Sequence, residues 1–118
     1  MAITVQNELG EIAINQHVVA KIAGAVATKC YGVVGMASRG RKDGLVSLLN
    51  IDNITKGVRI IPDEDGLAIE LHIMVEYGVN INVICSSIIH NVSYRVEQST
   101  GISVKKVDVL VESVRVGE

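Results

Sequence analysis

Histidines, cysteines and clustered acidic residues are the side chains in this sequence that could do chemistry, because they bind metals or exchange protons. The three histidines, His17, His72 and His90, form no HxH or HxxxH pair and no Cys/His cluster with metal-ligand spacing. Cys85 and His90 are five residues apart, which on a helix is too far around the axis for a nucleophile to face its base. The sequence therefore predicts no catalytic residue, no metal site and no cofactor, and we expect a protein that is not an enzyme.

Three consecutive acidic residues, Asp63, Glu64 and Asp65, resemble the start of a cation-binding loop. The later ligands of an EF-hand do not follow them. We interpret residues 62–66 as a solvated hairpin loop that begins at Pro62 and ends at Gly66.

The segment GVVG, which contains Gly32 and Gly35, has two functional interpretations. Glycine loops bind phosphate, but this one lacks the GK[ST] ending of a P-loop and no predicted strand immediately precedes it. A K-homology domain clamps RNA with a GxxG loop between helices, and nearby basic residues could contact phosphates: Arg39, Arg41 and Lys42. The acidic net charge, the apolar residues inside the motif and the shortage of stacking aromatics argue against RNA. The structural alternative is a turn in a loop region, residues 31–44, with the glycines at unusual backbone angles.

The composition indicates one globular domain that spans residues 1–118. A chain of 118 residues buries roughly two thirds of its unfolded surface, which is enough for a self-sufficient core. The sequence is 48% hydrophobic but contains no Phe and no Trp, so the core must be aliphatic. Its net charge is −2, and we therefore expect no general attraction to nucleic acid.

We expect a cytoplasmic protein that does not insert directly into a membrane. The N-terminal residues lack the basic and apolar regions of a signal peptide. The longest apolar runs fall far short of the roughly 20 residues that span a bilayer. The two cysteines, Cys30 and Cys85, form no CxxC motif, which favours reduced, buried thiols.

The clearest periodicity lies in residues 67–116. Residues 67–77 alternate apolar and polar side chains, which predicts a half-buried strand. A helix follows, with Asn82 as its N-cap and Gly101 at its C-terminal end. Residues 107–111 return to alternation, and the later change of parity predicts bulges near Ser113 and near Lys105 and Lys106.

The first half of the chain predicts a shorter series of elements. A strand covers residues 11–14, with a possible extension back through residues 4–5, and Asn15 caps a helix over residues 16–30. Asp43 could cap a short helix through residues 45–49, and residues 58–61 form a strand after Gly57.

These elements predict an α+β fold: a single two-layer α/β domain with two main helices on one face of a small antiparallel or mixed sheet. Their order is strand, helix, short helix, strand, strand, helix, strand. On the face of the sheet away from the helices, apolar or weakly polar residues stand among charged ones: Met74, Leu110, His72, Ala68 and Ile61. This face is either a plain exposed surface or a surface that pairs with a second copy or a protein partner.

Several stretches together carry a resemblance to a known family. The first predicted helix is followed by YGVVGM, the long strand ends in EYG, and the second helix ends in STGISV before a valine-rich strand. With these motifs the chain resembles the alkaline-shock-protein family of Gram-positive bacteria, especially its short, YloU-like members, over nearly its whole length. Residues 39–56 contribute least to the resemblance.

The resemblance implies a small cytosolic α/β protein linked to the envelope stress response and cell-envelope homeostasis, without an established catalytic activity. Some relatives self-associate, and some reach the membrane through a membrane-embedded partner. A kinase-like protein encoded nearby is a further candidate partner. We therefore expect a non-enzymatic interaction or scaffold protein, homo-oligomeric or bound to a protein partner, with RNA binding through the GVVG region as the alternative.

Overall fold

In the computed structural model, which describes residues 2–39, 46–49 and 51–116, the long strand β6 (Gly66–Glu76) is the centre of a five-stranded sheet. Two strands pair antiparallel with successive parts of one edge of β6, namely β5 (Val58–Asp63) and β3 (Val33–Arg39). The strand β7 (Val104–Arg115) pairs parallel with the other edge, and β4 (Val46–Leu48) pairs antiparallel with β3. The sheet is therefore mixed, and the expected α+β class is confirmed.

The alternation in β6 determines which face of the sheet is buried. Every second residue of β6 is buried, in the order Leu67, Ile69, Leu71, Ile73 and Val75. The predicted series continued to Tyr77, but this residue follows the end of the strand and is exposed. The parity of the strand is confirmed, and its C-terminal end is one residue earlier.

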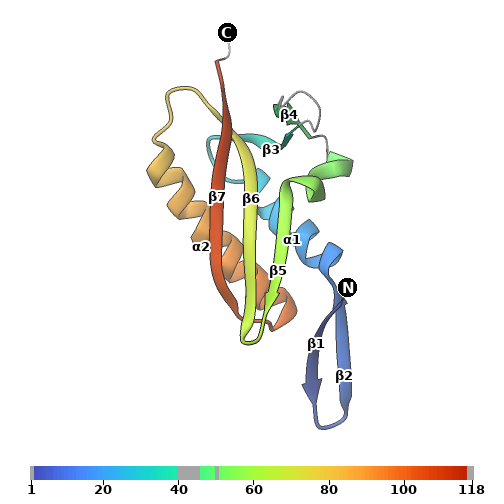
Figure 1. Cartoon of the computed structure of the whole chain (residues 1–118). Helices are drawn as coiled ribbons and strands as arrows, with labels where there is room; N and C mark the ends of the chain where they lie inside the picture. Colours follow the sequence, from blue (N-terminus) through green and yellow to red (C-terminus); the bar gives the residue numbers. More distant parts are fainter. Residues whose placement is uncertain (1, 40–45, 50, 117–118) are drawn as a thin grey trace.

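Two helices cover the buried face of the sheet (Figure 1). The first, α1 (Gln16–Thr28), packs with small buried residues such as Ala20, Ala23 and Ala27, which allow a close approach. The second, α2 (Ile81–Thr100), buries an aliphatic stripe: Ile84, Ile88, Val92 and Val96. The core that results is aliphatic throughout the described residues. No helix among them is long and apolar enough to span a membrane.

The helix ends follow their caps. The side chain of Asn15 accepts a hydrogen bond from the His17 amide at 2.8 Å, as predicted. Gly101 ends α2 in the left-handed conformation, also as predicted. The N-cap of α2 is Asn80 instead of the expected Asn82, because Asn80 has the extended backbone that a cap needs and accepts from the Val83 amide at 3.1 Å. Asn82 lies inside the first turn.

The N-terminal residues form a hairpin instead of one strand. Strand β1 (Ala2–Asn7) pairs antiparallel with β2 (Gly10–Asn15), and the Asn7 side chain accepts hydrogen bonds from the amides of Leu9 and Gly10. The hairpin projects beyond the end of the sheet (Figure 1), while its Ile3, Val5 and Ile14 side chains pack against the core. Residues 4–5 therefore belong to a separate strand and do not extend the strand of residues 11–14.

The predicted loop over residues 31–44 is wrong for residues 33–39, because Val33–Arg39 forms β3, and residues 40–44 lie outside the described residues. Gly32 turns the chain at φ 86°, and the β-branched residues after it then pair with β6. The predicted helix over residues 45–49 is also wrong, since Val46–Leu48 is the strand β4, and the helical turn η1 comes later (Ile51–Gly57). Asp43, the expected cap of the predicted helix, lies outside the described residues, as does Leu45.

The predicted irregularities of the last strand are confirmed. The register between β6 and β7 shifts between Leu67 and Ala68, where Lys105 is the extra residue on β7. It shifts again between Ile73 and Met74, where Glu112 is the extra residue. The two bulges place valines of both parities, Val104, Val107 and Val114, in register with buried residues of β6, although Val114 itself is 41% exposed.

Candidate interaction surface

The outer face of the sheet, defined here as the side turned away from α1 and α2, carries all five residues that the sequence suggested for an interaction surface. Met74, His72 and Ala68 come from alternate positions of β6, between the buried ones. Leu110 is paired with His72 across to β7, and Ile61 is paired with Ala68 across to β5. In Figure 1 this face looks toward the viewer, with the helices behind it.

The strand register divides these residues into two groups. Ile61 and Ala68 lie together near the hairpin between β5 and β6. Leu110, His72 and Met74 lie together farther along β6. A charged row crosses the sheet between the groups, formed by Arg59, Glu70 and Asp108 in register. The outer face therefore contains two small apolar areas with a charged strip between them.

His72 binds one carboxylate on each side of its ring. Its Nδ1 atom lies 2.6 Å from Glu112 Oε2 and its Nε2 atom lies 3.0 Å from Glu70 Oε1. The Glu112 side chain is only 8% exposed. Because Glu112 belongs to β7 and the other two residues to β6, this network ties the two strands together across the outer face.

The geometry of the network around His72 fits a structural role. The two carboxylate oxygens approach different ring nitrogens and do not converge on one point. Among the described residues, no group of three His, Cys, Asp or Glu side chains could hold a metal ion.

A further apolar residue of the outer face was not predicted. Leu48 of β4 lies over Gly35, since a Cβ atom at Gly35 would be 2.8 Å from Leu48 Cδ1. Gly35 is in register with Met74, so Leu48 extends the apolar group around Met74. No sequence pattern indicated this contact, because the apolar spacing of residues 45–49 predicted a helix where β4 forms.

Of the candidate loop contacts, Gly32, Gly35 and Arg39 lie in a turn and a strand. Gly32 sits at a turn, where a Cβ atom would be 2.2 Å from Ile84 Cδ1, and Gly35 is buried in β3. The GVVG segment leads from α1 into a strand, whereas a K-homology loop joins two helices. Arg39 ends β3, and Arg41 and Lys42 lie outside the described residues. This geometry gives the RNA-binding alternative no support.

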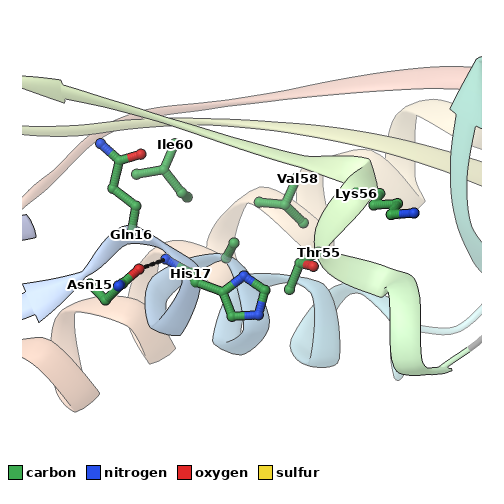
Figure 2. Close-up of a pocket in the computed structure, with 8 residues that line it drawn as sticks. Asn15, Gln16, His17, Thr55, Lys56, Val58 and Ile60 are labelled. Carbon is green, nitrogen blue, oxygen red and sulfur yellow. Dashed lines mark hydrogen bonds between the residues drawn. The ribbon is translucent and has the colours of Figure 1, made fainter. Parts of the chain in front are cut away.

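A surface hollow of about 340 Å³ lies beside the start of α1 (Figure 2). Its lining combines polar and apolar residues from α1, η1 and β5: Asn15, Gln16, His17, Ala20, Thr55, Lys56, Val58 and Ile60. Its two basic side chains, His17 and Lys56, are exposed, and the amide of His17 is already bound by Asn15. Figure 2 shows these side chains around the hollow, with the Asn15 side chain hydrogen-bonded to the backbone at His17.

The cysteines are free and half-buried. The Cys30 thiol lies 3.5 Å from the Val26 carbonyl oxygen of the preceding turn. Burial raises the pKa of the Cys85 thiol above its ordinary value. A raised pKa keeps this thiol protonated near neutral pH, and a reactive thiolate is therefore disfavoured.

Comparisons with known proteins give a consistent result. The chain is 37% identical over 117 residues to the uncharacterized protein YloU of Bacillus subtilis, and the alignment covers 98% of both chains. It is 32% identical to an uncharacterized protein of Streptococcus pyogenes, covering 98% of this chain and 97% of that one. It is 29% identical over 102 residues to the uncharacterized protein YqhY of B. subtilis, covering 86% of this chain and 74% of that one.

No solved structure matches the chain. Residues 4–116 match the alkaline shock protein 23 family, which is described as having a cell envelope-related function. The match covers all but the ends of the sequence, and it agrees with the resemblance carried by the YGVVGM, EYG and STGISV motifs. The chain therefore belongs to this alkaline-shock-protein family.

Proposed function

We propose that the chain is a non-enzymatic interaction protein with a cell-envelope-related role, and that it binds a protein partner through the outer face of its sheet. The observation that carries the proposal is the set of exposed apolar side chains on that face. Ile61 is 40% exposed and Leu110 is 37% exposed, although neither is needed to fill the core behind the sheet.

The arrangement of the outer face resembles a protein interface more than a solvated surface. Its apolar areas are flanked by exposed charged groups, such as Lys106 and Asp108, whose charged atoms lie 3.5 Å apart. Interfaces commonly combine an apolar centre with a polar rim of this kind. The network around His72 satisfies the polar groups in the middle of the face, so a partner could cover them without leaving those hydrogen bonds unmade.

The family and the shape of the site support a binding role over catalysis. The family has a cell envelope-related function, and the described residues offer neither a metal cluster nor a paired nucleophile and base. We place the protein in the cytoplasm, where a membrane-embedded partner would bring it to the envelope. A kinase-like protein is the other candidate partner.

Affinity capture with matched variants tests this proposal. Wild-type protein would be compared with the double variant Ile61→Lys, Leu110→Lys, using membrane and cytosolic fractions of cells that express the chain. Val18→Lys is the matched control, because it also replaces an exposed aliphatic residue but lies on α1, away from the outer face. Circular dichroism would verify that all three proteins are folded.

We expect wild type and Val18→Lys to capture one or more envelope-associated proteins. The amount captured by the double variant should be at least about tenfold lower. A tenfold decrease corresponds to about 1.4 kcal/mol of binding free energy, which two lysines placed in an apolar contact can readily cost. Equal capture by the double variant would show that the outer face is not the binding surface.

A further inference from the structure

The outer side of α2 has an unusual composition for an exposed helix. Its first 14 residues, Ile81 to Tyr94, contain no Asp, Glu, Lys or Arg. The buried stripe of α2 faces the core, and the opposite side forms what we call the α2 outer face: Asn82, Ser86, Ile89, His90, Ser93, Tyr94 and Glu97. Six of these residues, all but Asn82, line a shallow hollow of about 410 Å³.

This surface is not explained by the fold of one chain. Ile89 is 39% exposed and Tyr94 is 56% exposed, so neither completes the core. A helix side that faces only water normally carries charged residues. Depletion of charge together with exposed aliphatic and aromatic side chains is instead typical of the centre of a protein interface.

We propose that the α2 outer face binds the same face of a second copy, with the two helices antiparallel around a twofold axis between Ile89 and His90. The sequence is self-complementary about this point. Ser86 lies opposite the partner's Ser93, and the two small side chains allow the helices to approach closely on both sides of the axis. Ile89 and Tyr94 then fill the space beside them.

The charges select the antiparallel arrangement. Glu97 is the one formally charged residue of the α2 outer face, and it stands near the C-terminal end of its own helix, where a negative charge is unfavourable. Its Oε2 atom accepts from the Val104 amide at 2.9 Å, which fixes its position. An antiparallel partner places Glu97 opposite Asn82 in the first turn, at the positive end of the partner's helix dipole. A parallel pair would place Glu97 against Glu97.

Other occupants fit less well. A helix that binds a membrane surface normally presents Lys or Arg beside its apolar residues, and the α2 outer face contains none. Arg95, the basic residue of α2, does not line the hollow of the α2 outer face; it lines the neighbouring groove between α1 and α2, at the edge that Tyr94 forms. A neutral face with one acidic residue at one end is better matched by its own antiparallel copy.

The proposed dimer goes beyond the binding of a partner by the sheet. The α2 outer face and the outer face of the sheet lie on opposite sides of the molecule (Figure 1). A dimer through α2 would therefore leave both sheets free and present two binding faces at once, which raises the avidity for a clustered or dimeric partner. One helix pair is a small interface, so we expect a dissociation constant on the order of 1–100 µM.

Site-directed disulfide formation tests the geometry. In a background with Cys30→Ser and Cys85→Ser, protein with Ser86→Cys would be mixed with protein with Ser93→Cys under mild oxidation. The proposed axis brings these two positions together, and we expect the mixed disulfide to form at least about ten times faster than either homodimer. Two copies of residue 86, or of residue 93, would be about 10 Å apart along the helix axis, which is too far for a disulfide.

Sedimentation of the native-cysteine chain provides the second measurement. We expect Ile89→Lys to raise the dissociation constant at least about tenfold, because it places two lysines near the axis. Gln98→Lys is the control with the same added charge on another side of α2, and it should change the constant less than about threefold. Rapid disulfide formation by Ser86→Cys alone, equal effects of the two lysine variants, or a strictly monomeric chain at about 500 µM would overturn the proposal. The double variant of the sheet face should leave the mixed disulfide unchanged, so the two proposals fail separately.

Discussion

The turn at Gly32 offers a quantitative test of how α1, β3 and α2 fit together. Replacement by alanine adds one methyl group at a residue with φ 86°. A left-handed backbone costs a non-glycine residue roughly 1–2 kcal/mol. The added Cβ atom would also lie 2.2 Å from Ile84 Cδ1 and 3.3 Å from Val79 Cγ1, and relief of such a clash typically costs about 1–3 kcal/mol.

We expect Gly32→Ala to lower the free energy of unfolding by about 2–4 kcal/mol. Ile84 is almost fully buried, so its Cδ1 methyl group cannot move away without displacing its neighbours in the close-packed core. Chemical denaturation with urea at 25 °C measures the change. With a slope of about 2 kcal/mol per molar urea, in the middle of the usual range, the midpoint should fall by about 1–2 M.

Two further alanine variants separate strain from contact. Gly78 has a similar φ of 92° but nothing within 4 Å of the added Cβ. Gly78→Ala should therefore lower the free energy of unfolding only by the cost of the left-handed backbone, about 1–2 kcal/mol. Gly10 has neither a positive φ nor a close neighbour, and Gly10→Ala should stay within about 0.5 kcal/mol of wild type. If Gly32→Ala were no more destabilising than Gly78→Ala, the packing of α2 against this turn would be refuted.

Three other predictions follow from the caps, the thiols and the network on the sheet. Asn80→Ala should destabilise the protein by about 1 kcal/mol in thermal or urea unfolding, whereas Asn82→Ala should cost less than about 0.5 kcal/mol, because only Asn80 caps α2; the reverse order would restore the sequence-based cap. Burial raises the pKa of the Cys85 thiol, so its alkylation by iodoacetamide should reach half its maximal rate at a higher pH than the alkylation of a peptide cysteine. For the same reason the free energy of unfolding should decline as the pH rises above about 8.5, where the thiol of the unfolded chain ionises. An alkylation midpoint equal to or below that of the peptide would contradict this prediction. His72→Phe should cost about 1–3 kcal/mol, because the largely buried Glu112 carboxylate loses its 2.6 Å partner, and unchanged urea unfolding would show that the network is not stabilising.

The sequence was informative wherever local periodicity and burial coincide. The alternation along β6 identified its buried residues because a strand with one face on the core must alternate. The apolar stripes and Asn15 located α1, and Gly101 marked the end of α2, because these signals depend on residues within one or two turns. The change of parity in β7 predicted both bulges for the same reason, and the family resemblance depends on these same segments.

The sequence-based predictions of secondary structure were wrong where pairing with a distant segment determines the conformation. Residues 33–39 contain one glycine and one serine and follow a second glycine, Gly32, which suggests a loop, but β6 supplies hydrogen-bond partners along one edge of the segment. The short strand β4 forms because β3 is beside it, and β1 forms because β2 turns back on it. None of these partners can be inferred from the composition of the segment itself, since strand pairing is a long-range contact.

The candidate surface shows the same division. The sequence alone determined that Met74, His72 and Ala68 share the face of β6 that the core does not use, because side chains in a strand alternate between two faces. Only the tertiary structure decided that a charged row separates them into two groups, that Leu48 joins the group at Met74, and that Glu112 binds His72, because strand register and bulges are fixed by the packing of the whole sheet. The sequence alone shows that residues 81–94 of α2 contain no Asp, Glu, Lys or Arg, but which of them are exposed was decided by the side of the helix that the sheet and α1 cover.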